Sequence, residues 1–253
     1  MKRNTGQIKK YNKKVKTYLL IVAIAIFTVA FILSTAFISV FGMLYTPSFY
    51  TGIHESSDTA TKLNLSSEEL RRLTQHLIDY FSYRNNDLQI NVTLLNGFQY
   101  PFFTADELSH MVDVKNIFTG LWVFIVMSLA AMITLILVCI FVEKYPLKTI
   151  MKGIFFGSLG FLGFISVLGI IVAIDFNAAF TIMHMVLFPQ GNWTFSTSMV
   201  TLLPNLLFNT AAYVVVGVAA GATAALLGTS MIFFIIYTRK YGRHRLLQKY
   251  RTN

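Results

Sequence analysis

Long apolar runs alternate with polar segments along this chain. Three runs contain no charged residue over a length that can cross about 30 Å of hydrocarbon, namely 18–44, 117–142 and 153–174. Hydrophobic residues make up 55% of the 253 residues and charged residues only 13%, which excludes an ordinary soluble domain. The pattern therefore predicts a helical membrane protein.

A fourth apolar region, 185–238, is long enough for two spans, but Pro204, Asn205 and Asn209 interrupt its first half. Two spans there would separate the basic C-terminal tail from the other basic segments. We therefore expect a single span at 208–237. The expected fold is an all-α membrane protein with four transmembrane helices.

Basic residues gather in three segments. Of the 21 Lys and Arg residues, seven precede the first run, three lie between the second and third runs, and six follow the fourth. The positive-inside rule then predicts that both termini are cytoplasmic and that the segment after the first span is extracytoplasmic. The net charge of +10 is explained by topology signals and contacts with anionic membrane lipids, so we expect no nucleic-acid partner.

These features divide the chain into nine expected segments. They are a basic cytoplasmic tail (1–17), the first span (18–44), an extracytoplasmic cap (45–104), an interfacial helix start with the second span (105–142), a cytoplasmic loop (143–152), the third span (153–174), an extracytoplasmic interfacial segment (175–207), the fourth span (208–237) and a basic cytoplasmic tail (238–253). The only cysteine, Cys139, lies within the second run, so no disulfide is expected. Small residues at helical spacing predict close helix packing in the third and fourth spans, at Gly153, Gly157, Gly160, Gly163, Gly217 and Gly221.

The cap is expected to be a small α+β structure. Ser66 and Glu69 have capping-box spacing, and apolar residues follow at helical spacing to about Tyr83. Alternating polarity over 88–94 and the pair Asn96-Gly97 predict a hairpin with a two-residue turn. We expect no regular structure over 51–60, and we interpret His54 and His76 as ordinary solvated or packed residues.

The segment Glu107 to Lys115 places His110 at the boundary between water and lipid. Thr104 and Glu107 have capping-box spacing, so a helix should begin there and continue into the second span. On that helix Glu107 and Asp113 lie three residues to either side of His110, close enough to touch its imidazole. A side chain that changes charge near neutral pH is thus expected to be held by carboxylates beside the bilayer.

A second histidine, His184, follows the third span. Phe180, His184, Leu187 and Phe188 share one face of a short helix that Pro189 should end. The predicted topology brings this helix out on the same side as His110. A lone histidine on an apolar face is usually a core residue, and for His184 we leave this interpretation and a catalytic one equally open.

Several kinds of chemistry are disfavoured by the sequence. Paired ligand spacing typical of a metal site is missing, so neither a metal nor another cofactor is expected. No serine has the setting of an activated nucleophile, and Cys139 has no neighbouring base. The two histidines therefore favour general acid and base catalysis on a lipid ester or amide, with a nucleophile supplied by the substrate.

Three motifs in a four-span frame resemble the lipoprotein intramolecular transacylase family. They are Glu107-Leu-Ser-His-Met-Val-Asp-Val, Met183-His-Met-Val-Leu-Phe with Asn192-Trp193, and Leu203-Pro-Asn-Leu-Leu-Phe208. The resemblance implies a bacterial cell-membrane enzyme that moves the sn-2 acyl chain of a diacylglyceryl-modified N-terminal cysteine onto the α-amino group of that cysteine, giving a lyso-lipoprotein. It implies that His110 and His184 are the catalytic residues.

On this basis we expect His184 to act as base toward the amine and His110 as acid or electrostatic partner to the ester oxygen, although the roles could be exchanged. Asp113 or Glu107 would orient His110, and Tyr45 and Tyr50 are weaker candidates for oxyanion donors. The residues expected to bind substrate are Phe188, Asn192 and Trp193. The expected partners are a diacylated lipoprotein and membrane lipids, with the enzyme acting as a monomer.

Two other functions remain open at this point. The chain could be a non-enzymatic membrane module whose outer cap binds a protein or a lipid headgroup through pH-sensitive histidines. A transporter is a weaker alternative, because no charged residue lies in the middle of any predicted span.

Overall fold

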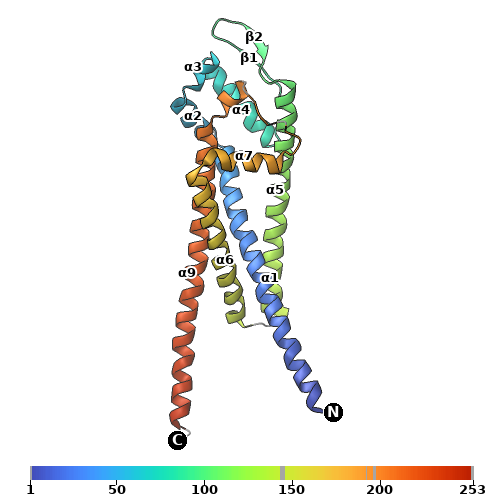
Figure 1. The fold of residues 1–253 in the computed structure, drawn as a ribbon, viewed down its shortest axis with the longest axis vertical. Coiled ribbons are helices and arrows are strands. Elements are labelled where there is room, and N and C mark those ends of the chain that lie inside the picture. The colour runs from blue at the N-terminus through green and yellow to red at the C-terminus, as the bar shows by residue number, and fades with distance from the viewer. Residues whose placement is uncertain (1, 143–145, 192, 196–197, 252–253) are drawn as a thin grey trace. The chain divides into compact units, whose positions relative to one another are not determined.

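The computed structural model describes residues 2–142, 146–191, 193–195 and 198–251 of the chain (Figure 1). Within this part, four helices are long and apolar enough to cross a membrane: α1 (Lys2–Leu44), α5 (Ala105–Leu137), α6 (Leu147–Ile174) and α9 (Asn205–Arg251). A short π-helical turn, η1 (Val138–Val142), continues α5. The prediction of four spans in a mostly helical protein is therefore confirmed for the described residues.

The helices extend beyond the apolar runs that predicted them. Helix α1 includes most of the basic N-terminal segment, and α9 continues through the basic C-terminal segment. Helix α6 begins at Leu147, directly after Pro146, although its uncharged run starts only at Gly153. Hydrophobicity marks the stretch that lipid can cover, whereas a helix continues until a residue or a tertiary contact ends it.

The chain forms two compact units. Unit 1 contains Met1–Thr35, Ile125–Val167 and Val218–Asn253. Here α1 and α6 approach closely at two glycines, because a Cβ atom on Gly157 would lie 2.5 Å from the backbone oxygen of Ala25 and one on Gly153 would lie 2.5 Å from the Cβ of Ile24. The expected glycine contacts are thus confirmed at these two positions. They are wrong for Gly160, Gly163, Gly217 and Gly221, where a Cβ would meet no atom of the described residues within 4 Å.

Unit 1 also contains a polar link between helices. The hydroxyl groups of Ser34 in α1 and Ser128 in α5 lie 2.7 Å apart and share a hydrogen bond. Such bonds contribute modestly to helix association in lipid. The N-terminal end of α1 and the C-terminal end of α9 lie at the same end of this unit (Figure 1), as an even number of spans requires.

Unit 2 contains Ala36–Phe124 and Leu168–Gly217, and it carries every other element. In chain order these are α2 (Pro47–Ser56), α3 (Thr59–Leu63), α4 (Ser67–Phe81), β1 (Asn91–Thr93), β2 (Gln99–Pro101), α7 (Phe176–Leu187) and α8 (Ser198–Leu202). The hydroxyl of Ser66 caps α4 by accepting a hydrogen bond from the Glu69 amide at 3.1 Å. The amphipathic helix expected in the cap is therefore confirmed.

A large hydrophobic cluster lies within the described part of unit 2. The apolar face of α4 provides Leu70, Leu73 and Leu77, all of them buried. It packs with residues of the hairpin, of the segment after it and of α8, among them Val92, Phe102, Phe103, Met199 and Leu202. The apolar face of α4 is thus buried against other elements of the cap, as its amphipathic pattern predicted.

Two expectations about the cap are wrong. Strands β1 and β2 pair antiparallel with Thr93 opposite Gln99, and Leu94 donates to the Phe98 oxygen, so the loop holds three residues and not two. Gly97 takes φ +85° there and allows the turn to close as a bulge. The stretch 51–60, expected to lack regular structure, is largely helical within α2 and α3.

Candidate functional site

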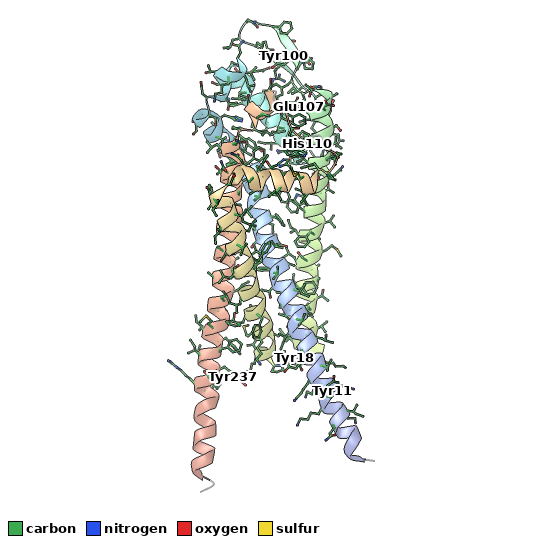
Figure 2. All side chains as sticks on the ribbon, in the orientation of Figure 1. Tyr11, Tyr18, Tyr100, Glu107, His110 and Tyr237 are labelled. Atoms are coloured by element: carbon green, nitrogen blue, oxygen red, sulfur yellow. The ribbon has the colours of Figure 1, made fainter. Side chains whose placement is uncertain are left out.

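His110 is positioned by the start of α5. The backbone amide of Thr104 donates to Oε2 of Glu107 at 2.8 Å, and the Glu107 amide donates back to the Thr104 hydroxyl at 3.3 Å. This is the expected capping box, which satisfies otherwise orphaned amides of the first turn. Glu107 is fully buried, so the helix start is fixed, and His110 follows one turn later (Figure 2).

His184 is positioned by α7. The carboxylate of Asp175 caps this helix by accepting a hydrogen bond from the Ala178 amide at 2.9 Å, and the helix ends at Leu187, before Pro189. One turn back from His184, the carbonyl of Phe180 accepts a hydrogen bond from Nδ1 of the imidazole at 2.9 Å. Because a carbonyl can only accept, Nδ1 carries the proton and the neutral ring keeps its lone pair on Nε2.

The two histidines meet inside unit 2. Their ring centroids lie 6.3 Å apart with an interplanar angle of 25°, and both side chains are buried, with exposures of 6% for His110 and 8% for His184. The two rings also interact electrostatically. Two motifs far apart in the chain therefore form one site, as their predicted place at the same membrane surface suggested.

Aromatic rings enclose the pair. Phe188 lies against both imidazoles, at centroid distances of 4.6 Å from His110 and 5.5 Å from His184. Phe195 lies 5.5 Å from His110, while Trp193 lies 5.1 Å from His184. Such walls exclude water and contribute apolar contact area for a lipid substrate.

Burial also controls the charge of His184. Loss of solvation lowers the pKa of this imidazole below its ordinary value of 6.5, and the hydrogen bond to the Phe180 carbonyl offsets part of that effect. At neutral pH the ring is therefore uncharged, with Nε2 available as a base. In His110, Nδ1 is buried and has no hydrogen-bond partner among the described residues.

Asp113 connects the two halves of the site. Its carboxylate accepts a hydrogen bond from the side-chain amide of Gln190 at 2.9 Å, which ties α5 to the segment after α7. It also interacts electrostatically with His110. Asp113 is therefore placed where it can support His110, whereas the contacts of Glu107 described above belong to the helix cap.

The structure separates the other expected site residues. Phe188 and Trp193 contact the histidines, while Asn192 lies outside the described residues. The hydroxyl of Tyr45 donates to the Phe81 carbonyl at 3.1 Å, and the buried ring of Tyr50 packs against Phe49 and His54. An oxyanion role for the two tyrosines, and the roles of the remaining site residues, stay predictions.

Sequence reasoning missed two walls of the site, because it did not select Phe180 or Phe195. His54 is a packed residue, one of the two alternatives expected for it, and its buried Nε2 donates to the Leu202 carbonyl at 2.9 Å. A signal for the helix that carries His54 was present, since Pro47 follows Thr46 as a typical first helical residue. For Phe195 the local sequence offers no periodic pattern.

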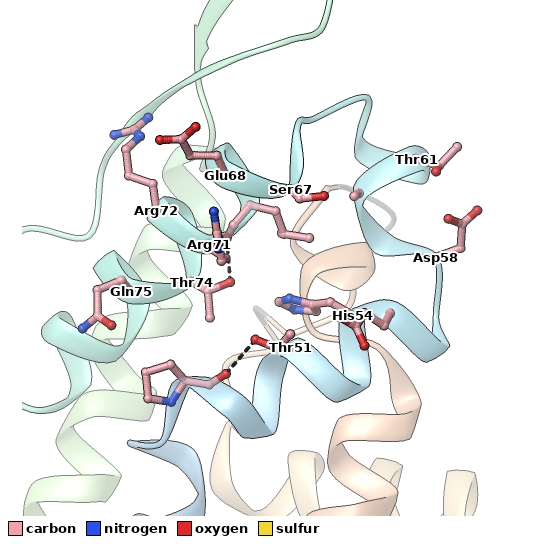
Figure 3. Close-up of a pocket in the computed structure, with 14 residues that line it drawn as sticks. Thr51, His54, Asp58, Thr61, Ser67, Glu68, Arg71, Arg72, Thr74 and Gln75 are labelled. Atoms are coloured by element: carbon pink, nitrogen blue, oxygen red, sulfur yellow. Dashed lines mark hydrogen bonds between the residues drawn. The ribbon is translucent and has the colours of Figure 1, made fainter.

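Two further features of unit 2 bear on ligands. A cleft of about 760 Å³ opens between α2, α3 and α4, and a smaller one of about 390 Å³ is lined by aromatic and hydroxyl side chains that include Tyr45 and Trp122 (Figure 3 shows the larger cleft). Neither is lined by His110 or His184. Among the described residues no group of three or more His, Cys, Asp or Glu side chains is arranged to hold a metal ion.

Comparison with known proteins identifies the family. The family model described as lipoprotein intramolecular transacylase Lit matches residues 8–208. The chain is also similar to the crystal structure of Lit from Bacillus cereus, with 17% identity and a TM-score of 0.70 over 90% of this chain and 99% of that one.

Two variants of the same Bacillus cereus protein, each with one histidine replaced, match in the same way. The arginine variant shows 16% identity and a TM-score of 0.66 over 94% of this chain and 99% of that one, and the alanine variant shows 17% and 0.67 over 92% and 99%. Comparison with curated protein sequences gave no match. The four membrane-spanning helices, the fold and the matched family model together establish that this chain belongs to the lipoprotein intramolecular transacylase family of membrane enzymes.

Proposed function

We propose that this enzyme moves the sn-2 acyl chain of a diacylglyceryl-modified N-terminal cysteine onto the α-amino group of the same cysteine. The observation that carries the proposal is the buried pair of imidazoles 6.3 Å apart, with Nε2 of His184 left as a lone-pair acceptor. This arrangement supplies a base and a second polar ring to one reacting centre. Family membership favours this enzyme over a non-enzymatic binding module.

In the proposed reaction His184 removes a proton from the substrate amine while the nitrogen attacks the ester carbonyl. A nitrogen–carbon bond forms, the ester carbon–oxygen bond breaks, and the proton taken from nitrogen ends on the released glycerol hydroxyl. His110 stabilises the developing charge on oxygen or delivers the proton, with Asp113 as its support. The α-amine has an ordinary pKa of about 7.7–8.0, so a weak base is sufficient to deprotonate it near neutral pH.

Proximity replaces a protein nucleophile in this scheme. Amine and ester belong to one substrate molecule, so holding them together converts the transfer into a unimolecular step with a large rate advantage. The aromatic walls around the histidines exclude water that would otherwise compete. No acyl-enzyme is required.

The proposed location follows from the distribution of basic residues. We place both termini in the cytoplasm and the histidine pair on the extracytoplasmic side, at the depth of the lipid headgroups. The lipoprotein then reaches a monomeric enzyme within the membrane, surrounded by lipid. A reporter that is active only outside the cell should be active when inserted near Asp87 and silent when fused to the C-terminus.

The decisive experiment must detect a transfer that leaves the substrate mass unchanged. Purified protein is incubated with a diacylated lipopeptide, and tandem mass spectrometry shows whether one acyl chain has moved from glycerol to nitrogen. A mixture of a lipopeptide with labelled acyl chains and an unlabelled one of different peptide mass tests whether transfer stays within one molecule. Label on the second peptide, or an acylated protein, would contradict the mechanism.

A further inference from the structure

The larger cleft of unit 2 lies apart from the histidine pair and has no role in the reaction proposed above. It is lined on one side by α2, including Thr51 and His54, and on the other by α4, including Arg71 and Thr74, with α3 closing one end (Figure 3). Its volume of about 760 Å³ is within the range of sites that bind small ligands or short peptide segments.

The charges of the cleft are unbalanced. Arg72 is neutralised by a bidentate ion pair with Glu69, whose oxygens lie 2.7 and 2.9 Å from the guanidinium nitrogens. The other four charged side chains that line the cleft have no ion-pair partner among the described residues: Glu55, Asp58, Glu68 and Arg71. Three carboxylates against one guanidinium leave an excess of negative charge for a ligand to neutralise.

A buried acceptor adds to these charges. His54 lines the cleft although it is only 6% exposed, and its Nε2 donates to the Leu202 carbonyl. Burial lowers the pKa of His54, so the ring is neutral and keeps a lone pair on Nδ1, to which none of the described residues donates a hydrogen bond. The cleft therefore combines an inner acceptor for an N–H group with outer carboxylates for cationic side chains.

A contact of the cleft lining leads to the histidine pair. Leu202 of α8 accepts the hydrogen bond from His54, which lines the cleft. Six residues later, the ring centroid of Phe208 lies 5.1 Å from that of Phe180, which in turn lies 4.0 Å from that of His184. The cleft and the histidine pair therefore lie in the same compact unit, so a polypeptide attached to a lipid at the histidine pair can reach the cleft.

We infer that the cleft binds the polypeptide of the lipoprotein, in the segment after the lipidated cysteine, and that it favours basic residues there. The inference rests on the proposed function, because that reaction brings such a polypeptide to the site. Peptide amides offer donors for Nδ1 of His54, and lysine or arginine side chains pair with the carboxylates. Because these contacts form before and during reaction alike, they should change KM and leave kcat nearly constant.

The test compares diacylated lipopeptides whose peptides carry lysines, glutamates or neutral residues. In the triple variant Glu55→Gln, Asp58→Asn, Glu68→Gln we expect KM for the lysine peptide to rise about 3- to 10-fold at low salt, from the typical worth of exposed ion pairs. This rise in KM should be smaller at high salt. Arg71→Gln should lower KM for the lysine peptide, and Asp87→Asn, outside the cleft, serves as the matched control.

A blocked substrate separates this inference from the reaction itself. Lipopeptides with an acetylated α-amine cannot react, so their binding to the full-length protein is measured without the chemical step, and differences between peptides with the same lipid report on the cleft. An unchanged unfolding temperature shows that the variants fold. Equal affinity for lysine and glutamate peptides, or an equal loss in the Asp87→Asn control, would overturn the cleft as a peptide site while transacylation stands. Charge-dependent binding without any acyl transfer would support the cleft and reject the proposed function.

Discussion

Replacing His110 and His184 singly and together tests whether they act on one transition state. Their ring centroids are 6.3 Å apart, a separation that a single amine and ester carbonyl can bridge. If one ring takes the proton while the other stabilises the oxygen, removal of either leaves the other without its task. We therefore expect His110→Asn and His184→Asn to show strongly non-additive losses of turnover.

The magnitude follows from the usual contribution of a positioned acid or base. Such a group is worth about 10²- to 10⁴-fold, or roughly 3 to 5 kcal/mol of activation free energy. Two independent contributions would multiply to about 10⁴- to 10⁸-fold, whereas a coupled pair loses most of the rate in the first substitution. Each single variant should thus fall by at least about 10²-fold, and the double variant should be scarcely slower than the worse single one.

The assay measures kcat for N-acylation of a diacylated lipopeptide by tandem mass spectrometry. His76→Asn is the matched control, because His76 also lies in unit 2 and bonds the Leu88 carbonyl but does not contact the pair. Binding of the acetylated analogue and the unfolding temperature should change little, which excludes misfolding. A near-native rate after loss of His110 would remove that residue from the chemistry, and a multiplicative double variant would show that the two rings work separately.

Three more outcomes follow from packing and charge. Substitution Gly157→Leu should lower the unfolding temperature because a Cβ there would collide with the Ala25 backbone, while Gly160→Leu, in open space, should not; equal shifts would contradict the close contact. Because burial lowers the pKa of His184 below 6.5, kcat should decrease only as the pH falls below about 6.5 and protonates this base. If kcat of the His184→Asn variant does not change over the same pH range, His184 is the group that titrates. Substitution Glu107→Ala should destabilise the protein by about 0.5 to 2 kcal/mol through loss of the capping box, and Glu107→Gln should restore much of it; identical melting of the two variants would reject this role.

The sequence predicted the features that depend on local chemistry. Absence of charge marked the four spans, and the Thr104 and Glu107 capping box located the start of α5 correctly. Pro189 likewise marked the end of the helix that carries His184. The capping box and the proline act within a few residues, and the absence of charge is a property of one continuous segment, so these signals can be recognised without knowledge of the tertiary structure.

Tertiary packing decided what the sequence could not. Helix α2 has weak local signals, yet it forms because Tyr50, Ile53 and His54 are buried in unit 2. The pair Asn96-Gly97 is compatible with either hairpin loop, and the register of the strands selected the longer one. Phe195 became a wall of the site only through a contact between segments remote in sequence.

The hydrogen bond from Nδ1 of His184 to the backbone carbonyl of Phe180 affects how well an amine and water can compete for the ester. A carboxylate behind an imidazole both orients the ring and favours its protonated form, whereas the Phe180 carbonyl orients the ring without a full negative charge. The result is a well-aimed but weak base. It suffices for an amine that is already partly neutral at physiological pH, but it gives little help to water, whose pKa of about 15.7 is far higher. Under the mechanism proposed above, the modest basicity of this one ring would therefore favour transfer of the acyl chain to nitrogen over its loss by hydrolysis.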